Sequence, residues 1–285
     1  MKKLMFAAAV MAVGAAMAVE SQIVGYQEIG QTSGNQLIQG CQFQKVGGTS
    51  VSLQDIVFKA GGEVAESGCD IWWWDNNKPG GGAGFVTKCE WSALYYDPDD
   101  PEAEDGFVFK PAWINWVDDM PVRVMKVFGP GEGFFAQPSR SNPTLSINGE
   151  VFGCDNTSDP VRSIDYLTSG DQLLVCNPFP TDVNLQDIVF TSAGEIAESG
   201  CDIWWWDNDR PGSAGFVTKC EWSALYYDPD DPEAEDGFVF KPAWVNWVDD
   251  MPVRVMKTFV PGEGFFAQPS RSAPKLTFPN AFYAK

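Results

Sequence analysis

The sequence CDIWWWDNN at residues 69–77 returns almost unchanged as CDIWWWDND at residues 201–209. Successive side chains of a β-strand point to opposite faces of the sheet, so three consecutive tryptophans cannot share one face. We expect Trp72 and Trp74 on one face and Trp73 on the other. At least one face is expected to pack against a core. The remaining face is expected to be a ligand platform, a contact between two domains or a contact between molecules, because exposed aromatic patches usually have one of these roles.

The glycine-rich segment after the tryptophans predicts a turn. One glycine of DNNKPGGGAG (75–84) is missing from the second copy. A deletion inside a strand would move every later side chain to the opposite face of the sheet. The copies nevertheless stay almost identical beyond this point, so the deletion is expected in a loop. We therefore predict a turn between one strand, DIWWW (70–74), and another, GFVTKCEW (84–91).

The turn also predicts a disulfide in each copy. If Ile71 lies opposite Thr87, then Cys69 lies directly opposite Cys89. Directly opposed residues of an antiparallel pair are close enough for a disulfide. We expect a third disulfide in the second copy, and Cys41 then remains either as a buried thiol or as a link to another chain. The cysteines expected in disulfides are Cys69 with Cys89, Cys201 with Cys220, and Cys154 with Cys176.

An internal repeat covers most of the chain. Residues 91–126 return at 222–257 with a single change, from Ile114 to Val245. A unit of this length is a domain rather than a solenoid repeat. We therefore predict a signal peptide over residues 1–18, a first β domain over 19–149 and a second β domain over 150–285.

The local pattern within each copy predicts an all-β fold. Short runs rich in Val, Ile, Phe, Tyr and Trp alternate with clusters of Gly, Pro, Asp and Asn. Many short strands at regular spacing are typical of sandwiches and barrels, so we expect two tandem homologous β-sandwich or barrel-like domains. SLQDIVF at residues 52–58 fits either one turn of helix or a strand.

The N-terminus predicts export. Lys2 and Lys3 precede an apolar run over residues 4–18 that closes on small residues, which is the pattern of a secretory signal peptide. We expect the mature protein to be extracellular, at the cell surface or periplasmic. No later stretch is apolar enough for a membrane-spanning helix, so the mature chain is expected to have none.

The composition narrows the expected partners and chemistry. The 285-residue chain has a net charge of −20, which disfavours nucleic acid and anionic membranes as partners. It contains no histidine, so the Ser-His-Asp triad is excluded and most zinc sites are disfavoured. The remaining expected partners are glycans, envelope proteins or further copies of the chain.

The first candidate site is an acidic loop, DPDDPEAED, at residues 97–105 and 228–236. Calcium takes six to eight oxygen ligands on a flexible frame, and alternate acidic residues supply several of them. A solvated acidic loop between strands is the alternative. No other cofactor is expected. The candidate calcium ligands are Asp97, Asp99 and Asp100, with Asp228, Asp230 and Asp231 in the second copy.

The second candidate site is the tryptophan cluster itself. Flat indole faces stack on sugar rings, and a neighbouring carboxylate accepts hydrogen bonds from sugar hydroxyls. Core packing is the alternative, and we assign Trp91 and Trp113 to the core. The candidate ligand-binding residues are Trp72, Trp73, Trp74 and Asp75, with Trp204, Trp205, Trp206 and Asp207 in the second copy.

A third candidate is the paired aspartates of WVDDM at residues 116–120 and 247–251. Two carboxylates suit glycoside hydrolysis, but Asp-Asp is also common in β turns. Tandem copies are more natural for binding than for catalysis, because multivalent binding gains from a second copy without new contacts. We therefore expect no enzymatic activity and assign no catalytic residue.

The layout of the chain resembles a loose class of exported bacterial proteins with tandem β-rich repeats. The resemblance lies in the signal peptide, IVGY at 23–26, GEGFF at 131–135 and LSINGEV at 145–151. It implies export and a β fold, and it implies no particular activity. The preferred hypothesis is an exported, non-enzymatic surface or extracellular protein with a structural, adhesive or interaction role. The alternative is a tandem carbohydrate-binding module, with or without calcium.

Overall fold

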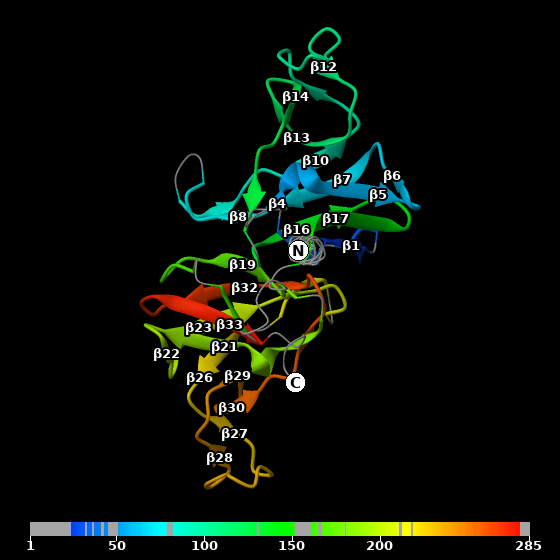
Figure 1. The fold of residues 1–285 in the computed structure, drawn as a ribbon. Helices are drawn as coiled ribbons and strands as arrows, with labels where there is room; N and C mark the ends of the chain where they lie inside the picture. The colour runs from blue at the N-terminus through cyan, green and yellow to red at the C-terminus, as the bar shows by residue number, and fades with distance from the viewer. Residues whose placement is uncertain are drawn as a thin grey trace, which may run out of the picture.

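A computed structural model of the chain describes residues 24–31, 33–35, 37–40, 43–44, 51–78, 82–129, 131–151, 161–164, 167–179, 181–210, 213–217 and 219–279. Over these residues the secondary structure consists of β-strands and two short 3₁₀ helices. The strands form two similar halves, which confirms the predicted all-β fold with two homologous units. Figure 1 shows the halves one above the other. No helix in this described part of the chain is long and apolar enough to cross a membrane.

The first half contains two main sheets. The smaller has the order β1–β17–β5–β6, with β3 also beside β17, and the larger has the order β12–β11–β14–β13–β10–β7–β16–β2. The strands of the smaller sheet are β1 Val24–Gly30, β3 Phe43–Gln44, β5 Ile56–Ala60, β6 Glu63–Val64 and β17 Pro143–Val151. The strands of the larger sheet are β2 Leu37–Gly40, β7 Ser67–Trp72, β10 Cys89–Ser92, β11 Tyr95–Tyr96, β12 Phe107–Val108, β13 Ala112–Val117, β14 Met120–Arg123 and β16 Gly133–Pro138. The half also contains two short pairs, β4 Val51–Ser52 with β15 Val127–Phe128 and β8 Trp74–Asp75 with β9 Gly84–Phe85.

The second half repeats this arrangement. Its smaller sheet is β18–β33–β21–β22, and its larger sheet is β19–β32–β23–β26–β29–β30–β27–β28. The strands of the smaller sheet are β18 Val161–Ile164, β21 Val189–Ser192, β22 Glu195–Ile196 and β33 Pro274–Pro279. The strands of the larger sheet are β19 Leu173–Cys176, β23 Ser199–Trp204, β26 Cys220–Ser223, β27 Tyr226–Tyr227, β28 Phe238–Val239, β29 Ala243–Val248, β30 Met251–Arg254 and β32 Gly264–Pro269. The short pairs are β20 Val183–Asn184 with β31 Thr258–Phe259 and β24 Trp206–Asp207 with β25 Gly215–Phe216.

The core of each half lies between its two sheets. In the first half it joins Phe58 of the smaller sheet to Ile71 and Trp113 of the larger sheet, and all three are fully buried. The indole N–H of Trp113 donates to the carbonyl of Ile56 over 2.6 Å, so the largest core residue also has its polar group satisfied. Trp91 is buried beside it with 5.1 Å between ring centroids. The assignment of Trp91 and Trp113 to the core is confirmed.

The segment SLQDIVF forms both of the structures that its sequence allowed. Leu53–Asp55 is a 3₁₀ helix, η1, and β5 follows directly. Ser52 and Asp55 form a capping box at the start of this helix. The Gln54 side chain then donates to the carbonyls of Trp113 and Val124, each over 2.8 Å, and so ties the helix to β13 and the segment after β14. The second half has the equivalent helix, η2, at Leu185–Asp187.

The turn after the tryptophans is present, but the register of its strands differs from the prediction. β8 pairs with β9 across the glycine-rich segment, as expected. In the β7–β10 pair, however, Cys89 lies opposite Ile71, and the register shifts again between Glu90 and Ser92. Cys89 is therefore two residues away from the position opposite Cys69. Trp73 interrupts the strand between β7 and β8, which allows the two strand pairs to adopt different registers.

This register explains why the predicted disulfides of the hairpins are not formed. Cys69, Cys89, Cys201 and Cys220 are buried and are not joined in disulfides, so the pairing predicted for them was wrong. The second half has the same register, with Cys220 opposite Ile203. The prediction assumed an unbroken ladder from Cys69 to the turn.

The third predicted disulfide is not formed either. Cys176 is a buried free thiol that contacts the backbone of Gly40 in the first half. A β-carbon added at Gly40 would lie 1.9 Å from the Cys176 sulfur, so only glycine fits this contact. Cys154 and Cys41, the other residues of that prediction, lie outside the described residues.

The halves meet through the same strands of each larger sheet. β16 of the first half lies against β19 of the second, and β2 of the first half lies against β32 of the second. In the same way, β8 of the first half contacts β19, and β24 of the second half contacts β2. The backbone N–H of Cys176 donates to the carbonyl of Gly131 over 2.9 Å. The contact therefore has pseudo-twofold symmetry, like an isologous dimer interface within one chain. In Figure 1, β16, β19 and β32 lie at the centre of the molecule.

The predicted domain boundary lies within a strand of the first half. The boundary between residues 149 and 150 falls inside β17, which pairs with β1 and β5 of the first half. The first half therefore extends to at least Val151. Residues 1–18, the predicted signal peptide, lie outside the described residues.

Candidate functional site

Trp72 and Trp74 lie in the contact between the halves. The side chain of Trp72 is 6% exposed, and its ring stacks on Phe135 with 5.2 Å between centroids. The Trp74 ring meets Phe266 of the second half edge to face. Three roles were expected for the face that does not pack against a core. In the structure, the face with Trp72 and Trp74 forms the contact between the two domains.

The second copy is placed in the same way. Trp204 stacks on Phe266 with 5.4 Å between ring centroids, and Trp206 meets Phe135 of the first half edge to face. The alternation of faces expected for the three tryptophans is therefore present in both copies. Because protein covers the broad surface of this cluster, most of the predicted tryptophan platform does not face solvent.

Trp73 and Trp205 take the opposite face and pack against the core of their own half. Trp73 meets Phe128 edge to face at 5.8 Å, and Trp205 meets Phe259 at the same distance. Both indoles are half-buried. The two remaining predicted ligand residues are Asp75 and Asp207. Asp75 accepts a hydrogen bond from the backbone N–H of Asn77 over 2.8 Å, and Asp207 accepts one from the backbone N–H of Asp209 over 2.9 Å.

In the acidic loops, part of the carboxylate set is used within the loop. The Asp100 carboxylate accepts hydrogen bonds from the backbone N–H of Glu102 and from the Tyr95 hydroxyl, and these hold the pKa of Asp100 below its ordinary value. Asp97 accepts from the backbone N–H of Asp99 over 3.3 Å. Glu102 forms an ion pair with Lys110.

Calcium binding by these loops stays a prediction. Among the described residues, no group of three or more acidic, cysteine or histidine side chains is arranged to hold a metal ion. The structure therefore does not gather the candidate ligands Asp97, Asp99 and Asp100 into a coordination cluster. Asp228, Asp230 and Asp231 repeat the same loop, with Tyr226 donating to Asp231 over 3.1 Å.

The paired aspartates of WVDDM lie at the tip of a hairpin. Asp118 and Asp119 connect β13 to β14 and have φ angles of +49° and +63°. Positive φ at both central residues is the signature of the type I′ turn, which usually selects Asn-Gly. The turn alternative for this pair therefore has direct support in the backbone. Asp249 and Asp250 have the same angles in the second copy.

Two tryptophans outside the predicted set of ligand residues, Trp116 and Trp247, are exposed. Their side chains are 56% and 52% exposed, whereas the other tryptophans are buried or half-buried. The indole N–H of Trp116 donates to Glu90, and that of Trp247 donates to Glu221 over 3.1 Å. This hydrogen bond gives each exposed indole a preferred orientation. The feature of the sequence that could have marked Trp116 is its position. It lies just before the Asp-Asp turn, beyond Trp113 and Ile114, which are the buried residues of the same strand.

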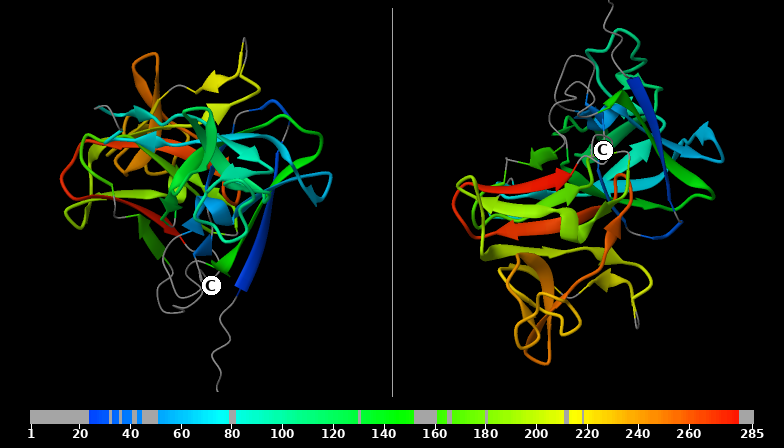
Figure 2. Two further views of the ribbon diagram at one scale, coloured as in Figure 1. Left: turned by 90° about the horizontal axis from the view of Figure 1, so that it is seen from above. Right: turned by 60° about the horizontal axis from the view of Figure 1, so that its bottom comes forward.

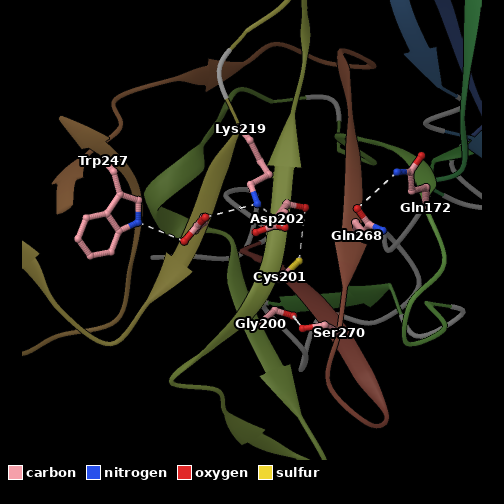
Figure 3. A network of polar contacts seen from close by, with 9 residues as sticks. Gln172, Gly200, Cys201, Asp202, Lys219, Trp247, Gln268 and Ser270 are labelled. Atoms are coloured by element: carbon pink, nitrogen blue, oxygen red, sulfur yellow. Dashed lines mark hydrogen bonds and ion pairs between the residues drawn. The ribbon is translucent and has the colours of Figure 1, made fainter. Parts of the chain in front are cut away.

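A row of polar side chains continues from each exposed tryptophan across the larger sheet. In the second half, Glu221 lies opposite Asp202, which lies opposite Gln268 on the next strand. Lys219 bridges the row, with its ammonium 2.9 Å from Asp202 and 3.4 Å from Glu221. Figure 3 shows this network with Trp247 at one end. The Asp202 carboxylate is the main cause of a raised pKa for Lys219.

The first half has the same polar row. Lys88 lies 3.7 Å from the Asp70 carboxylate and donates to Gln137 over 3.0 Å. Its ammonium also lies 4.3 Å from the centroid of the Trp72 ring. Each half thus presents an oriented indole beside carboxylates, an ammonium and an amide, which are groups that bind ligands by stacking and hydrogen bonding.

The exposed tryptophans belong to a lobe at the outer end of each half. The lobes containing β13–β14 and β29–β30 point away from each other in Figure 1 and in the right panel of Figure 2. Several further apolar residues of these lobes are exposed. They are Phe109, Val117 and Val122 in the first half, and Phe240, Val248 and Val253 in the second.

Comparison with known proteins adds no assignment. No protein-family model and no curated protein sequence matches the chain.

Proposed function

We propose that the protein is an exported, non-enzymatic binding protein with two equivalent heads, acting as an interaction or adhesive component outside the cytoplasm. Each head is the outer lobe of one half and is centred on Trp116 or Trp247. The observation that supports this most directly is the exposure of these two indoles, each held by a carboxylate. Exposed apolar surface in a soluble domain favours a binding site, because leaving such surface in water is unfavourable.

The arrangement of the heads supports bivalent binding. The pseudo-twofold contact joins the halves by their inner strands and leaves one lobe at each end of the molecule (Figure 1). The lobe sequences differ by a single residue over 91–126 and 222–257, so both heads are expected to bind the same partner. Two linked sites on a repetitive surface typically exceed the affinity of one site by about 10²–10⁴-fold.

Glycans are the partner class that the polar row favours. The exposed indole offers a stacking face, and Glu90, Asp70 and Gln137 lie on neighbouring strands where sugar hydroxyls would find hydrogen-bond acceptors. This supports the carbohydrate-binding alternative at a surface other than the one that the three consecutive tryptophans suggested. An envelope protein that docks on the apolar residues of the lobes is the second candidate partner.

A glycan array tests the proposal. The mature protein, its Trp116→Ala and Trp247→Ala variants and the double variant are applied in calcium and again in EDTA. We expect the double variant to lose binding, and each single variant to bind without cross-linking glycan-coated beads. The matched control is Phe109→Ala, which removes an exposed aromatic ring of the same lobe that has no N–H to donate to a carboxylate.

The outcomes separate the alternatives. Binding by the double variant at the wild-type level would refute the assignment of the heads. Loss of binding in EDTA would give the acidic loops a role. A blank array would exclude the tested glycans, and sedimentation of the wild type and the double variant would then test self-association through the lobes.

A further inference from the structure

A groove lies at the boundary between the halves, beside the consecutive tryptophans of the first copy. Its volume is about 350 Å³, within the range of pockets that bind small ligands. Residues from both halves line it. They include Trp73, Trp74, Asp75 and Met125 from the first half, and Asp171 and Leu173 from the second.

The groove is anionic. Lys126 also lines it, but its ammonium is paired with the Glu132 carboxylate over 2.6 Å. Among the described residues, Asp75 and Asp171 form no ion pair, and the Asp75 carboxylate accepts a hydrogen bond from the backbone N–H of Asn77. Two partly exposed carboxylates therefore line the groove without a neighbouring cation paired to them, and charge complementarity favours a cationic ligand.

The same wall of the groove already holds an ammonium. The Nζ atom of Lys126 lies 5.8 Å from the centroid of the Trp73 ring and 5.0 Å from that of Phe128. Aromatic faces attract cations within about 6 Å of the ring centroid. An aromatic wall with a carboxylate nearby is thus a working ammonium site within this protein.

The apolar part of the groove matches the rest of such a ligand. Trp74, Met125 and Leu173 offer surface for methylene groups, while Asp75 and Asp171 offer acceptors for charged ends. We propose that the groove binds an alkylammonium ligand, a flexible methylene chain ending in primary ammonium groups. A free polyamine and lysine side chains share this chemistry. The proposal does not depend on the heads at Trp116 and Trp247.

The second copy provides an internal comparison. Trp205, Lys257 and Glu263 repeat the ammonium site, with 2.6 Å between Lys257 and Glu263. Asn35 corresponds to Asp171. Each of them directly follows a glycine, Gly34 or Gly170, whose backbone N–H makes the equivalent hydrogen bond in its own half. The second copy therefore has an amide where the first groove has the Asp171 carboxylate, and we expect one strong site per chain.

Calorimetric titration with spermidine at physiological salt tests the proposal. We expect saturable binding with one site in the full mature chain. Removing a charged hydrogen-bond partner should weaken binding about tenfold, so Asp171→Asn and Asp75→Asn should each raise Kd by about that factor. Asp119→Asn, in the distant hairpin turn, is the charge-matched control and should leave Kd unchanged. Asn35→Asp should add a second site.

Further titrations distinguish a free polyamine from a lysine-bearing protein as the ligand, and some of their outcomes would refute the proposal. Tighter binding of a dilysine peptide than of spermidine would point to a protein partner, and the reverse would point to a free polyamine. The proposal is overturned if no saturable binding occurs, or if Asp119→Asn weakens binding as much as Asp171→Asn, which would indicate diffuse attraction to the net charge. Equal binding of a neutral diol of the same length would also overturn it. The Trp116→Ala, Trp247→Ala double variant should retain this binding, which separates the result from the proposed heads.

Discussion

The Trp74 ring meets Phe266 of the opposite half edge to face, with 5.6 Å between ring centroids. Trp206 meets Phe135 in the same way at 5.9 Å. Each half therefore inserts its own tryptophan against the phenylalanine of the other. Aromatic pairs of this geometry contribute about 0.5–1.5 kcal/mol beyond the area they bury. The consecutive tryptophans thus join the halves and position the two outer lobes.

Removal of Phe135 should weaken this contact strongly. Phe135 is 2% exposed and touches Trp72, Trp206 and Phe216. Phe→Ala in a buried site typically costs about 3–5 kcal/mol, and urea unfolding followed by tryptophan fluorescence should show a loss of this size for Phe135→Ala. The exposed Phe109→Ala should change stability by less than about 0.5 kcal/mol. Equal effects of both variants would contradict the assigned contact.

The Asp-Asp turns should be open to stabilisation. Positive φ is unfavourable for both Asp118 and Asp119 and is favourable for Asn-Gly in a type I′ turn. The double substitution Asp118→Asn, Asp119→Gly should raise the free energy of unfolding by about 0.5–1 kcal/mol. Thermal unfolding followed by circular dichroism measures this. Asp99→Asn, outside any positive-φ position, is the control, and a double variant no more stable than this control would argue against the turn assignment.

The five described cysteines should be unreactive thiols in the native protein. Burial raises the pKa of Cys89 and of Cys220 to about 12, which leaves almost no thiolate at neutral pH. In a Cys41→Ser, Cys154→Ser variant, a thiol reagent should label no cysteine in buffer and five in urea, without reductant. Three or fewer labelled thiols in urea would mean that at least one disulfide exists.

Stability should fall at alkaline pH because of these thiols. The unfolded thiol ionises near its ordinary pKa of 9.0, whereas the folded Cys89 keeps its proton to about 12, mainly because of burial and secondly because of Asp70. The stabilisation is therefore complete below pH 9 and is lost between pH 9 and 12, at no more than about 1.4 kcal/mol per pH unit for each thiol. Urea unfolding at several pH values measures this slope. Cys89→Ala should make it shallower, and an unchanged slope would show that other groups are responsible.

Much of the fold followed from local patterns. The repeat is visible directly as the near-identity of residues 91–126 and 222–257. The alternating tryptophan faces, the turn after them and the core positions of Trp91 and Trp113 follow from side-chain alternation and turn residues. The prediction failed at the register of β7 and β10, because the break at Trp73 is a local departure from ideal strand geometry. A slip of two residues keeps every side chain on its expected face, so hydrophobic patterning alone could not detect it.

The candidate sites were less accessible to sequence reasoning. Trp72 and Trp116 are both tryptophans near aspartates in strands, and nothing local distinguishes the covered one from the exposed one. The groove at Asp171 is lined by residues of both halves, and Asp75 and Asp171 are about 100 residues apart in the chain.

The sequence by itself therefore determined the strands, the duplication and which tryptophans share a face, because strand periodicity is set by neighbouring residues. Only the tertiary structure decided what covers each face. Trp74 is covered because the second half presents Phe266 to it, whereas no aromatic ring of the described residues packs on Trp116, which is 56% exposed. Burial is a property of the surfaces that meet, and these come from segments that local sequence does not relate to each other.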